Sequence, residues 1–273
     1  MPTLSSRFGA AWPNLNPVIK WHTNAREHQG GRFLVWGTTT RAARERTGVV
    51  LRATIMLCAV PFDFIEPCLP ATAYEPPSGE QWLHELGHDG YRLIARKNAG
   101  RITLYGRERN DLTERFPLIV EALINLRQRS CLIDGEAVAC GDDGIPSFDH
   151  LQDGRLDENV LLYAFDLIEF DGIDLRRDPL TKRKAALEYM LADAAPGIRF
   201  NRHFDERDGS LFFHQACKLG LEGVVSKRCD SRYVSGRTLH WIKVRNPNSP
   251  AAKRNAAVVG SCSLNRAMSA AHA

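Results

Sequence analysis

The sequence predicts an α+β fold in which antiparallel sheets are flanked by helices. Residues 91–97 and 101–105 are strand-like and flank the turn Asn98-Ala99-Gly100, which is the pattern of a β-hairpin. Apolar residues then recur at helical spacing, at Phe116, Ile119, Val120, Leu123 and Leu126. Hairpins mixed with helices favour an α+β fold over a parallel, doubly wound sheet.

Later segments continue the alternation of strands and helices. Further strands are predicted over residues 131–140, 159–169, 223–227 and 241–244. Asp178 is predicted to cap a helix that has Pro179 at its first position. Another helix is predicted over residues 208–219, and Gly220 is the expected C-cap.

The two ends of the chain differ from its middle. Residues 1–53 show no sustained period of either kind, so we expect an irregular, poorly ordered extension. Residues 248–273 are rich in Ala, Ser and Asn, which predicts a disordered tail. One folded domain is therefore expected over residues 54–247.

The composition is typical of a globular protein, with 44% hydrophobic and 25% charged residues among 273. The net charge of +4 favours a polyanionic partner. The seven cysteines include no C-x-x-C pair, which favours reduced thiols over a disulfide framework or a zinc site. The apolar segment 49–60 is too short to span a bilayer, and no secretory signal opens the chain. We therefore expect a cytoplasmic protein without a membrane partner.

Several charged residues occur where the pattern predicts apolar strands. These residues are Asp134, Glu136, Asp166, Glu222, Lys227, Lys243 and Arg245. Charges on such strands are costly to bury unless they are paired or bind a ligand. Together they predict a polar cleft walled by sheets.

This set of residues suits a nucleoside triphosphate. Lysines neutralise phosphate oxygens, carboxylates hold Mg²⁺, and an aromatic ring can stack on a base. Each feature alone has a simpler interpretation, because an isolated Asp-Gly-Glu is most often a turn and an isolated lysine is most often an exposed strand end. Only the order of the features along the chain makes the interpretation specific.

Residues 85–92 resemble the first motif of the covalent nucleotidyltransferases, E-x-K-x-D-G-x-R, with Gly87 at the position of the lysine. Further blocks resemble the later motifs of that family in the same order, and these are Arg107 and residues 134–136, 163–167, 222–227 and 241–245. The sequence between the blocks is most similar to ATP-dependent DNA ligases of the bacterial end-joining type. The resemblance implies a nucleotidyltransferase (ATP-grasp-like) adenylation domain over residues 54–247. It also implies no C-terminal OB-fold, because too few residues follow Arg245.

The resemblance also implies a reaction and its ligands. In this family a lysine attacks the α-phosphate of ATP and forms a lysyl-AMP with release of pyrophosphate. The adenylate passes to the 5′-phosphate of a nick, and the 3′-hydroxyl then displaces AMP. The implied ligands are ATP (or AMP) and Mg²⁺, and the implied substrate is nicked or broken double-stranded DNA. A monomer that works with other end-joining repair proteins is expected.

The family motifs imply a role for each matching residue around the nucleoside. Glu85 would lie beside the adenine, and Phe165 would stack on it. Arg92 and Glu136 would lie near the ribose, and Arg107 would approach the ribose or the phosphate of the nick.

A second set is implied around the phosphates. Glu222, with Glu136, would hold the metal, while Lys227 and Lys243 would bind the α-phosphate and stabilise its developing charge. The implied nucleotide-binding set is completed by Asp89 and Arg245.

The sequence departs from the family pattern at the nucleophile. Gly87 has no side chain and cannot form a phosphoramidate, so self-adenylation is expected to be impaired. Nothing in the sequence places Lys97, the next lysine along the chain, at the α-phosphate. Two smaller departures are Arg109, where the family usually has glycine, and Arg245, where it has lysine.

Three hypotheses follow from the sequence. The chain is a ligase-like enzyme with impaired self-adenylation, or a non-catalytic protein that binds nucleotide and nicked DNA, or an enzyme that seals only pre-adenylated nicks. The last remains possible because the final step of the reaction does not use the lysine.

Overall fold

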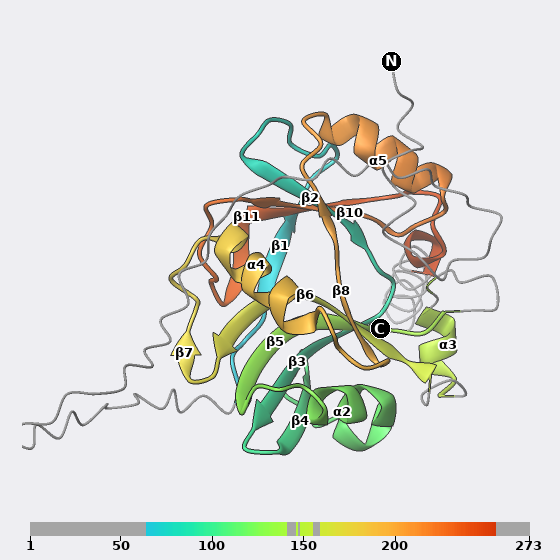
Figure 1. The fold of residues 1–273 in the computed structure, drawn as a ribbon. Helices are drawn as coiled ribbons and strands as arrows, with labels where there is room; N and C mark the ends of the chain where they lie inside the picture. The colour runs from blue at the N-terminus through green and yellow to red at the C-terminus, as the bar shows by residue number, and fades with distance from the viewer. Residues whose placement is uncertain (1–63, 141–145, 147, 155–158, 255–273) are drawn as a thin grey trace, which may run out of the picture. The chain divides into compact units, whose positions relative to one another are not determined.

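The computed structural model describes residues 64–140, 146, 148–154 and 159–254, all within one compact unit of the chain. The predicted extension at residues 1–53 and the apolar segment 49–60 lie outside the described residues. Two sheets form this part of the chain, and helices pack against them (Figure 1).

The first sheet has the strand order β1-β11-β10-β2-β9 within the described residues. Its strands are β1 (Cys68–Thr72), β2 (Trp82–Gly87), β9 (His203–Phe204), β10 (Gly223–Arg228) and β11 (Gly236–Arg245). The second sheet has the order β4-β3-β5-β6-β7, with β8 beside β6. Its strands are β3 (Tyr91–Asn98), β4 (Arg101–Gly106), β5 (Ser130–Val138), β6 (Leu161–Phe170), β7 (Ile173–Asp174) and β8 (Ile198–Phe200).

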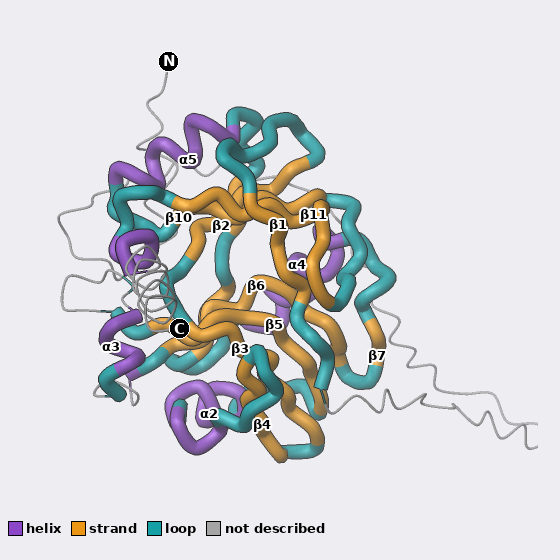
Figure 2. The backbone as a smooth tube through the Cα atoms, turned by 180° about the vertical axis from the view of Figure 1, so that it is seen from behind, coloured by secondary structure: helices purple, strands orange, loops and turns teal. Residues whose placement is uncertain are grey.

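Four helices pack against the two sheets within the described residues. They are α2 (Pro117–Ile124), α3 (Phe148–Gln152), α4 (Leu180–Leu191) and α5 (Gly209–Lys218), with a 3₁₀ turn at Thr113–Arg115. Helix α5 covers the first sheet on the side away from the second sheet, and α2 lies beside β4 (Figures 1 and 2). None of the helices in the described ranges is long and apolar enough to cross a membrane.

Two apolar clusters hold these layers together. The larger one lies within the second sheet and its helices, and it includes Leu93 of β3, Phe116 before α2 and Leu187 of α4. The smaller one connects the two sheets through Phe165 of β6 and Trp241 of β11. The sheets are therefore packed together at one end, and their polar side chains meet beside this contact.

The predicted hairpin is confirmed. Strands β3 and β4 pair in antiparallel register from Leu93↔Gly106 to Asn98↔Arg101. Ala99 and Gly100 both have positive φ values, 48° and 90°, as a two-residue turn of type I′ requires. Lys97, at the end of β3, donates hydrogen bonds to the carbonyl oxygens of Leu123, Ile124 and Leu126, and thus caps the C-terminus of α2.

Helix α5 is also confirmed with its caps. The Asp208 carboxylate accepts a hydrogen bond from the Leu211 backbone N–H, and Gly220 beyond the helix has φ +72°. The predicted cap of α4 is wrong, because Pro179 occupies the N-cap position and no side chain caps the helix. The Asp178 carboxylate instead pairs with Lys182, four residues along, at 2.9 Å.

The predicted antiparallel pairing holds for most neighbouring strands, but β1–β11 and β6–β8 are parallel. Strand β11 is longer than predicted because its first half, from Gly236, pairs with β1, a short strand that contains a proline. Order also continues past the predicted boundary at residue 247. Ser249 and Ala251 are buried, and residues 250–254 form a helical turn.

Candidate functional site

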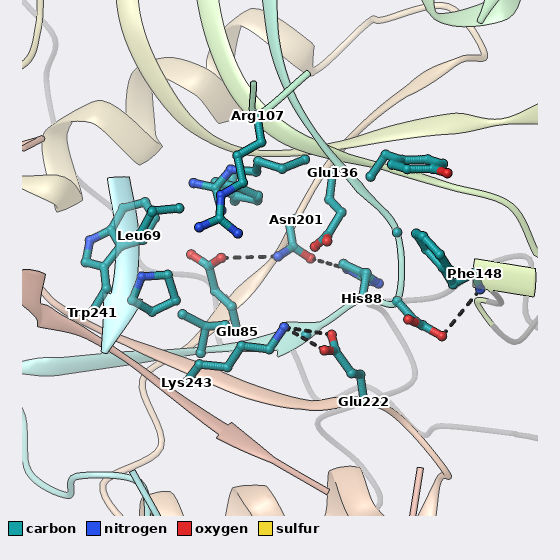
Figure 3. Close-up of a pocket in the computed structure, with 18 of the residues that line it drawn as sticks. Leu69, Glu85, His88, Arg107, Glu136, Phe148, Asn201, Glu222, Trp241 and Lys243 are labelled. Atoms are coloured by element: carbon teal, nitrogen blue, oxygen red, sulfur yellow. Dashed lines mark hydrogen bonds and ion pairs between the residues drawn. The ribbon is translucent and has the colours of Figure 1, made fainter. Parts of the chain in front are cut away.

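A cleft of about 1130 Å³ opens between the two sheets, and strands of both contribute to its wall (Figure 3). Every residue that the family resemblance implied for the nucleotide, the metal or the phosphates lines this cleft. These residues are Glu85, Gly87, Asp89, Arg92, Arg107, Glu136, Phe165, Glu222, Lys227, Lys243 and Arg245. Six strands and the loops between them therefore converge on one polar cavity.

Strand register explains how residues far apart in sequence share this wall. Two rows of paired residues cross β2, β10 and β11, namely Glu85–Val225–Lys243 and Gly87–Gly223–Arg245. Paired residues of antiparallel strands point to the same face, and so do residues two apart on one strand. Both rows therefore face the cleft, and the Gly87 row is without side chains on two of its three strands.

Glu85 is a buried carboxylate held by two lysines. The Nζ of Lys184 lies 2.7 Å from its Oε1, and the Nζ of Lys227 lies 2.8 Å from its Oε2. Burial alone would raise the pKa of Glu85, but the two lysines outweigh burial and hold the pKa at about 2. Glu85 is therefore ionised at neutral pH and fixes the position of Lys227.

Phe165, the ring predicted to stack on a base, is covered by cations. The Arg92 guanidinium carbon lies 4.4 Å from the ring centroid, and Lys227 Nζ lies 4.2 Å from it. The Lys227 ammonium also lies 4.0 Å from the centroid of Trp241. Because Phe165 is only 5% exposed, a base can stack on it only after one of these cations shifts.

Glu222 and Lys243 form an ion pair on the opposite wall. The Nζ of Lys243 lies 2.7 Å from Oε1 and 2.8 Å from Oε2 of Glu222 (Figure 3). Glu136 lies nearby on β5. Burial raises the pKa of Glu136 to about 7, and the negative charges of Glu222 and Asp89 add to the rise against the opposing effect of Lys243.

These carboxylates form an incomplete set of metal ligands. The described residues contain no cluster of three or more His, Cys, Asp or Glu side chains that could hold a metal by itself. Mg²⁺ commonly takes only one or two carboxylates and completes its shell with phosphate and water. Glu136 and Glu222 fit that pattern, provided that Lys243 releases Glu222.

At Gly87 the wall of the cleft consists of backbone alone. A Cβ added there would lie 3.3 Å from the carbonyl oxygen of Gly223 and 3.6 Å from Oε2 of Glu222. The φ of Gly87 lies outside the left-handed region, so its backbone conformation suits any residue. Gly223, its partner on β10, has φ +147°, and a Cβ there would lie 2.1 Å from the Val244 carbonyl oxygen. Gly223 is thus required by the fold, whereas Gly87 is not.

Among the cleft residues that the sequence analysis missed, His88 and Asn201 are the two that are linked to Glu85 by hydrogen bonds. His88 Nε2 and Asn201 Oδ1 lie 2.9 Å apart, and Asn201 Nδ2 donates to Oε2 of Glu85 at 3.1 Å. Burial lowers the pKa of His88 to about 4, so the ring is neutral and its Nε2–H is the donor to Asn201. Asn201 follows β8 in a segment without any motif, and no local pattern could have indicated its contact with Glu85.

Two carboxylates expected in the cleft are instead fully buried in ion pairs. Asp134 accepts two hydrogen bonds from Arg92, at 2.6 and 2.7 Å. Asp166 accepts two from Arg183, at 2.7 and 2.8 Å. Asp134 and Asp166 therefore stabilise the walls of the cleft and do not line it.

The helical turn at the C-terminal end of the described residues contacts the site. Arg254 forms ion pairs with Asp89, on the turn between β2 and β3, and with Asp149 of α3, the latter at 3.2 Å. Its guanidinium carbon lies 5.4 Å from the ring centroid of Phe148, which lines the cleft. Arg254 thus connects three segments around one end of the cavity.

Comparison with known proteins agrees with this geometry. The family described as the ATP dependent DNA ligase domain matches residues 68–245. The multifunctional non-homologous end joining protein LigD of Pseudomonas aeruginosa is 41% identical over 189 residues, which cover 67% of this chain and 22% of that protein. The SPbeta prophage-derived DNA ligase-like protein LigB of Bacillus subtilis is 31% identical over 188 residues, which cover 67% of this chain and 68% of that protein.

Solved structures show the same fold. A mycobacterial DNA ligase D complexed with ATP and MES superposes with a TM-score of 0.60 at 31% identity, covering 67% of this chain and 62% of that one. The ligase domain of LigD from M. tuberculosis superposes with a TM-score of 0.59 at 31% identity, covering 66% of this chain and 60% of that one.

The fold and the cleft thus define a nucleotidyltransferase adenylation domain. The chain belongs to the ATP-dependent DNA ligase family, and it resembles the ligase domains of the bacterial end-joining type. The matched region spans 22% of the length of the Pseudomonas relative.

Proposed function

We propose that this domain binds ATP or AMP together with nicked or broken duplex DNA, and that it does not adenylate itself. One observation supports this proposal above the others. All of the side chains that the family resemblance implies for nucleotide and phosphate binding line one cleft, while the position of the nucleophile, Gly87, has no side chain.

Different residues of the cleft are proposed to bind the nucleoside, the α-phosphate and the metal. Arg92, Phe165 and Trp241 form the apolar and cationic wall proposed for the nucleoside. Lys227 and Lys243 supply the positive charge proposed for the α-phosphate. Mg²⁺, held by Glu136 and Glu222, would neutralise phosphate charge.

Binding of a phosphate requires an exchange of partners. Lys243 is paired with Glu222, and Lys227 is paired with Glu85. A phosphate that enters the cleft competes with these carboxylates for the ammonium groups. We propose that Lys243 moves from Glu222 to the phosphate, which frees the Glu222 carboxylate for the metal.

The proposed reaction is the sealing of nicks that already carry a 5′-adenylate. The 3′-hydroxyl oxygen attacks the phosphorus of the DNA 5′-phosphate, the bond from that phosphorus to the AMP oxygen breaks, and AMP leaves. The hydroxyl proton passes to water or to a carboxylate of the cleft. This step forms no bond to the protein, so the glycine at position 87 does not prevent it.

Two measurements test the proposal. Incubation of the full chain with α-labelled ATP, followed by denaturing electrophoresis, is expected to give no labelled protein. Incubation with pre-adenylated nicked DNA in the absence of ATP is expected to give sealed product and free AMP. A labelled protein band would overturn the first part of the proposal.

Failure to seal would leave the non-catalytic alternative, which the tight Lys243–Glu222 pair favours because it withholds Lys243 from a phosphate. That alternative predicts salt-sensitive binding to nicked duplex in preference to intact duplex, without product. The names of the relatives place end joining among their functions, so broken ends and other end-joining proteins are the proposed context.

A further inference from the structure

The wall of the cleft at position 87 is open where the family has a side chain. Gly87 and its cross-strand neighbour Gly223 both lack side chains, and both belong to the row that faces the cleft. Gly87 itself lines the cavity of about 1130 Å³. The nearest atoms to a Cβ at this position are the backbone of Gly223 and the Oε2 of Glu222.

The lysines that line the cleft are held by carboxylates. Lys243 is bound by both oxygens of Glu222, and Lys227 is bound by Glu85. Lys184 is also bound by Glu85 and is buried behind the wall. Each of these ammonium groups is ion-paired, and a protonated, paired ammonium is not a nucleophile.

The opening at position 87 is nevertheless suited to an amine. The Glu222 oxygen that lies 2.8 Å from the Lys243 ammonium is the same oxygen that would lie 3.6 Å from a Cβ at position 87. An amine placed here therefore lies near a carboxylate that already binds one ammonium.

We propose that the opening at Gly87 accepts a small linear primary amine, which takes the part of the absent lysine and receives AMP from ATP. This inference rests on the proposed binding of ATP in the cleft. The chemical class follows from the side chain that is absent, because n-butylamine is the side chain of lysine without its backbone. The product is a free N-alkyl phosphoramidate of AMP, and the protein remains unmodified.

The step balances without an oxidant or reductant. The nitrogen lone pair of the neutral amine attacks the α-phosphorus of ATP and forms a P–N bond. The bond from the α-phosphorus to the bridging oxygen of the β-phosphate breaks, and pyrophosphate leaves with that electron pair. The amine loses one proton, which passes to a carboxylate of the cleft or to water.

Pyrophosphate release from ATP is the measurement, with the full chain, Mg²⁺ and a series of amines from methylamine to n-hexylamine. The assay is run at about pH 9, where a useful fraction of an amine with a pKa near that of lysine is neutral. We expect release to rise by at least about 10-fold at saturating n-butylamine, since binding converts an intermolecular attack into one between held groups. Shorter, longer and branched amines such as tert-butylamine are expected to be less effective, and mass spectrometry should find butyl-AMP phosphoramidate.

The variant Gly87→Ala gives a stricter test of the position. Its methyl group supplies the first carbon of the lysine side chain, so the best amine should become n-propylamine, one methylene shorter. Gly87→Met fills the opening with a side chain of lysine-like length and no amine, and it should abolish the dependence on amine. Turnover of each variant is compared at its own saturating ATP concentration.

Separate measurements distinguish failure of this inference from failure of the proposed function. The dissociation constant of ATP and the sealing of pre-adenylated nicks are determined on the same preparations. ATP binding or sealing without any effect of amines would overturn the inference alone. A stimulation by amines that ignores chain length, or that is the same in Gly87→Met, would show that the amine acts elsewhere and would also overturn it.

Discussion

Gly87 lies two residues from Glu85 on the same strand and faces the same cleft, yet the two positions differ in how strictly the structure defines them. Glu85 is buried and held by Lys184, Lys227 and Asn201. Gly87 contacts little and has a backbone conformation open to any residue. Replacement of Glu85 would leave two lysines without their carboxylate, whereas Gly87 can be replaced at small cost.

Gly87→Lys is expected to restore labelling of the protein by α-labelled ATP. The new Cβ requires a shift of only a few tenths of an ångström at the Gly223 carbonyl, which lies 3.3 Å away, and the cost in stability should be about 1 kcal/mol. Denaturing electrophoresis measures the label, and peptide mapping locates it. Gly87→Met, which has similar bulk but no amine, is the matched control and should stay unlabelled. A labelled Gly87→Met protein would show that some other residue is adenylated.

His88, the residue after Gly87, is held firmly. Its ring stacks on Tyr163 with centroids 4.3 Å apart, and its Nε2–H is bound by Asn201. Sequence alone could indicate Gly87 and its neighbours through the order of the motifs. It could not indicate Asn201 or Lys184, because their contacts with Glu85 depend on the chain returning to β2 after the second sheet is complete.

Helix α2 depends on a lysine from a neighbouring strand. Its sequence predicts the helix through apolar spacing. At its C-terminus the backbone N–H groups of Asn125 and Leu126 donate to the carbonyl oxygens of Glu121 and Leu123. Lys97 of β3 supplies three hydrogen bonds there, at 3.0, 2.8 and 2.7 Å, from a side chain that is 5% exposed. This contact also explains why Lys97 is not available to the cleft.

Lys97→Met should lower the free energy of unfolding by about 3 kcal/mol, because buried carbonyl groups lose a charged donor. Urea denaturation followed by circular dichroism measures the loss. Lys182→Met serves as the control, since the Lys182–Asp178 pair is on the surface, with the lysine side chain 67% exposed, and should contribute less than about 1 kcal/mol. Equal losses in the two variants would refute the capping role.

Helix α4 is fixed to β6 by a buried ion pair instead of by the predicted cap. Arg183 is fully buried and binds both oxygens of Asp166, and it also donates to the carbonyl oxygens of Asp178 and Ser231. The sequence suggested that Asp166 lies in the cleft, because no motif indicates that Arg183, 17 residues further along, is its partner. A buried charge therefore has two readings from sequence, ligand or ion pair, and only tertiary structure separates them.

Arg183→Met should cost about 4 kcal/mol, since it leaves the Asp166 carboxylate buried without a counter-charge. The double variant Arg183→Met with Asp166→Leu should recover much of this loss, because no charge remains buried. Chemical denaturation of both proteins gives the comparison. If the double variant is no more stable than Arg183→Met, uncompensated charge is not the cause of the loss.

Over the whole domain, the described structure follows the sequence best where elements have a strong local pattern. The β3–β4 hairpin, β5, β6, α2 and α5 were all predicted, and their patterns are local. Strands β1 and β2 were not, because β1 is short and contains Pro70, while β2 carries the polar residues His84 and Glu85 at buried positions. Their partner strands, β11 and β10, come more than 100 residues later in the sequence, so no local pattern indicates the pairing.

The stability of the domain should fall in mild acid because of His88. Its pKa is about 4 in the folded protein and about 6.5 in the unfolded chain, so the unfolded chain binds the proton more readily. The contribution of neutral His88 to the free energy of unfolding is complete above about pH 6.5. It is lost as the pH falls toward 4, at about 1.4 kcal/mol per pH unit. Between pH 7 and 5 the expected loss from His88 is about 2 kcal/mol.

Urea denaturation at several pH values tests this expectation against the variant His88→Phe, which keeps an aromatic ring on Tyr163. The pH dependence of the variant should be flatter by the same amount, whatever its absolute stability. His84 and His203 also have pKa values lowered by burial and remain in both proteins, so their contribution cancels in the comparison. Parallel pH profiles for the two proteins would contradict the assignment.

The pairing of Gly87 with Gly223 has a consequence for how this domain could change over generations. At Gly223 a side chain would collide with the backbone of β11, so a substitution there would require the sheet to be rebuilt. At Gly87 a side chain requires a shift of only a few tenths of an ångström at the Gly223 carbonyl, and the ion-paired Glu222 and Lys243 already line the cleft there. The backbone at position 87 is therefore compatible with a side chain. If position 87 is the nucleophile position that the family resemblance implies, a lineage that carries this glycine is one substitution away from the residue of that motif.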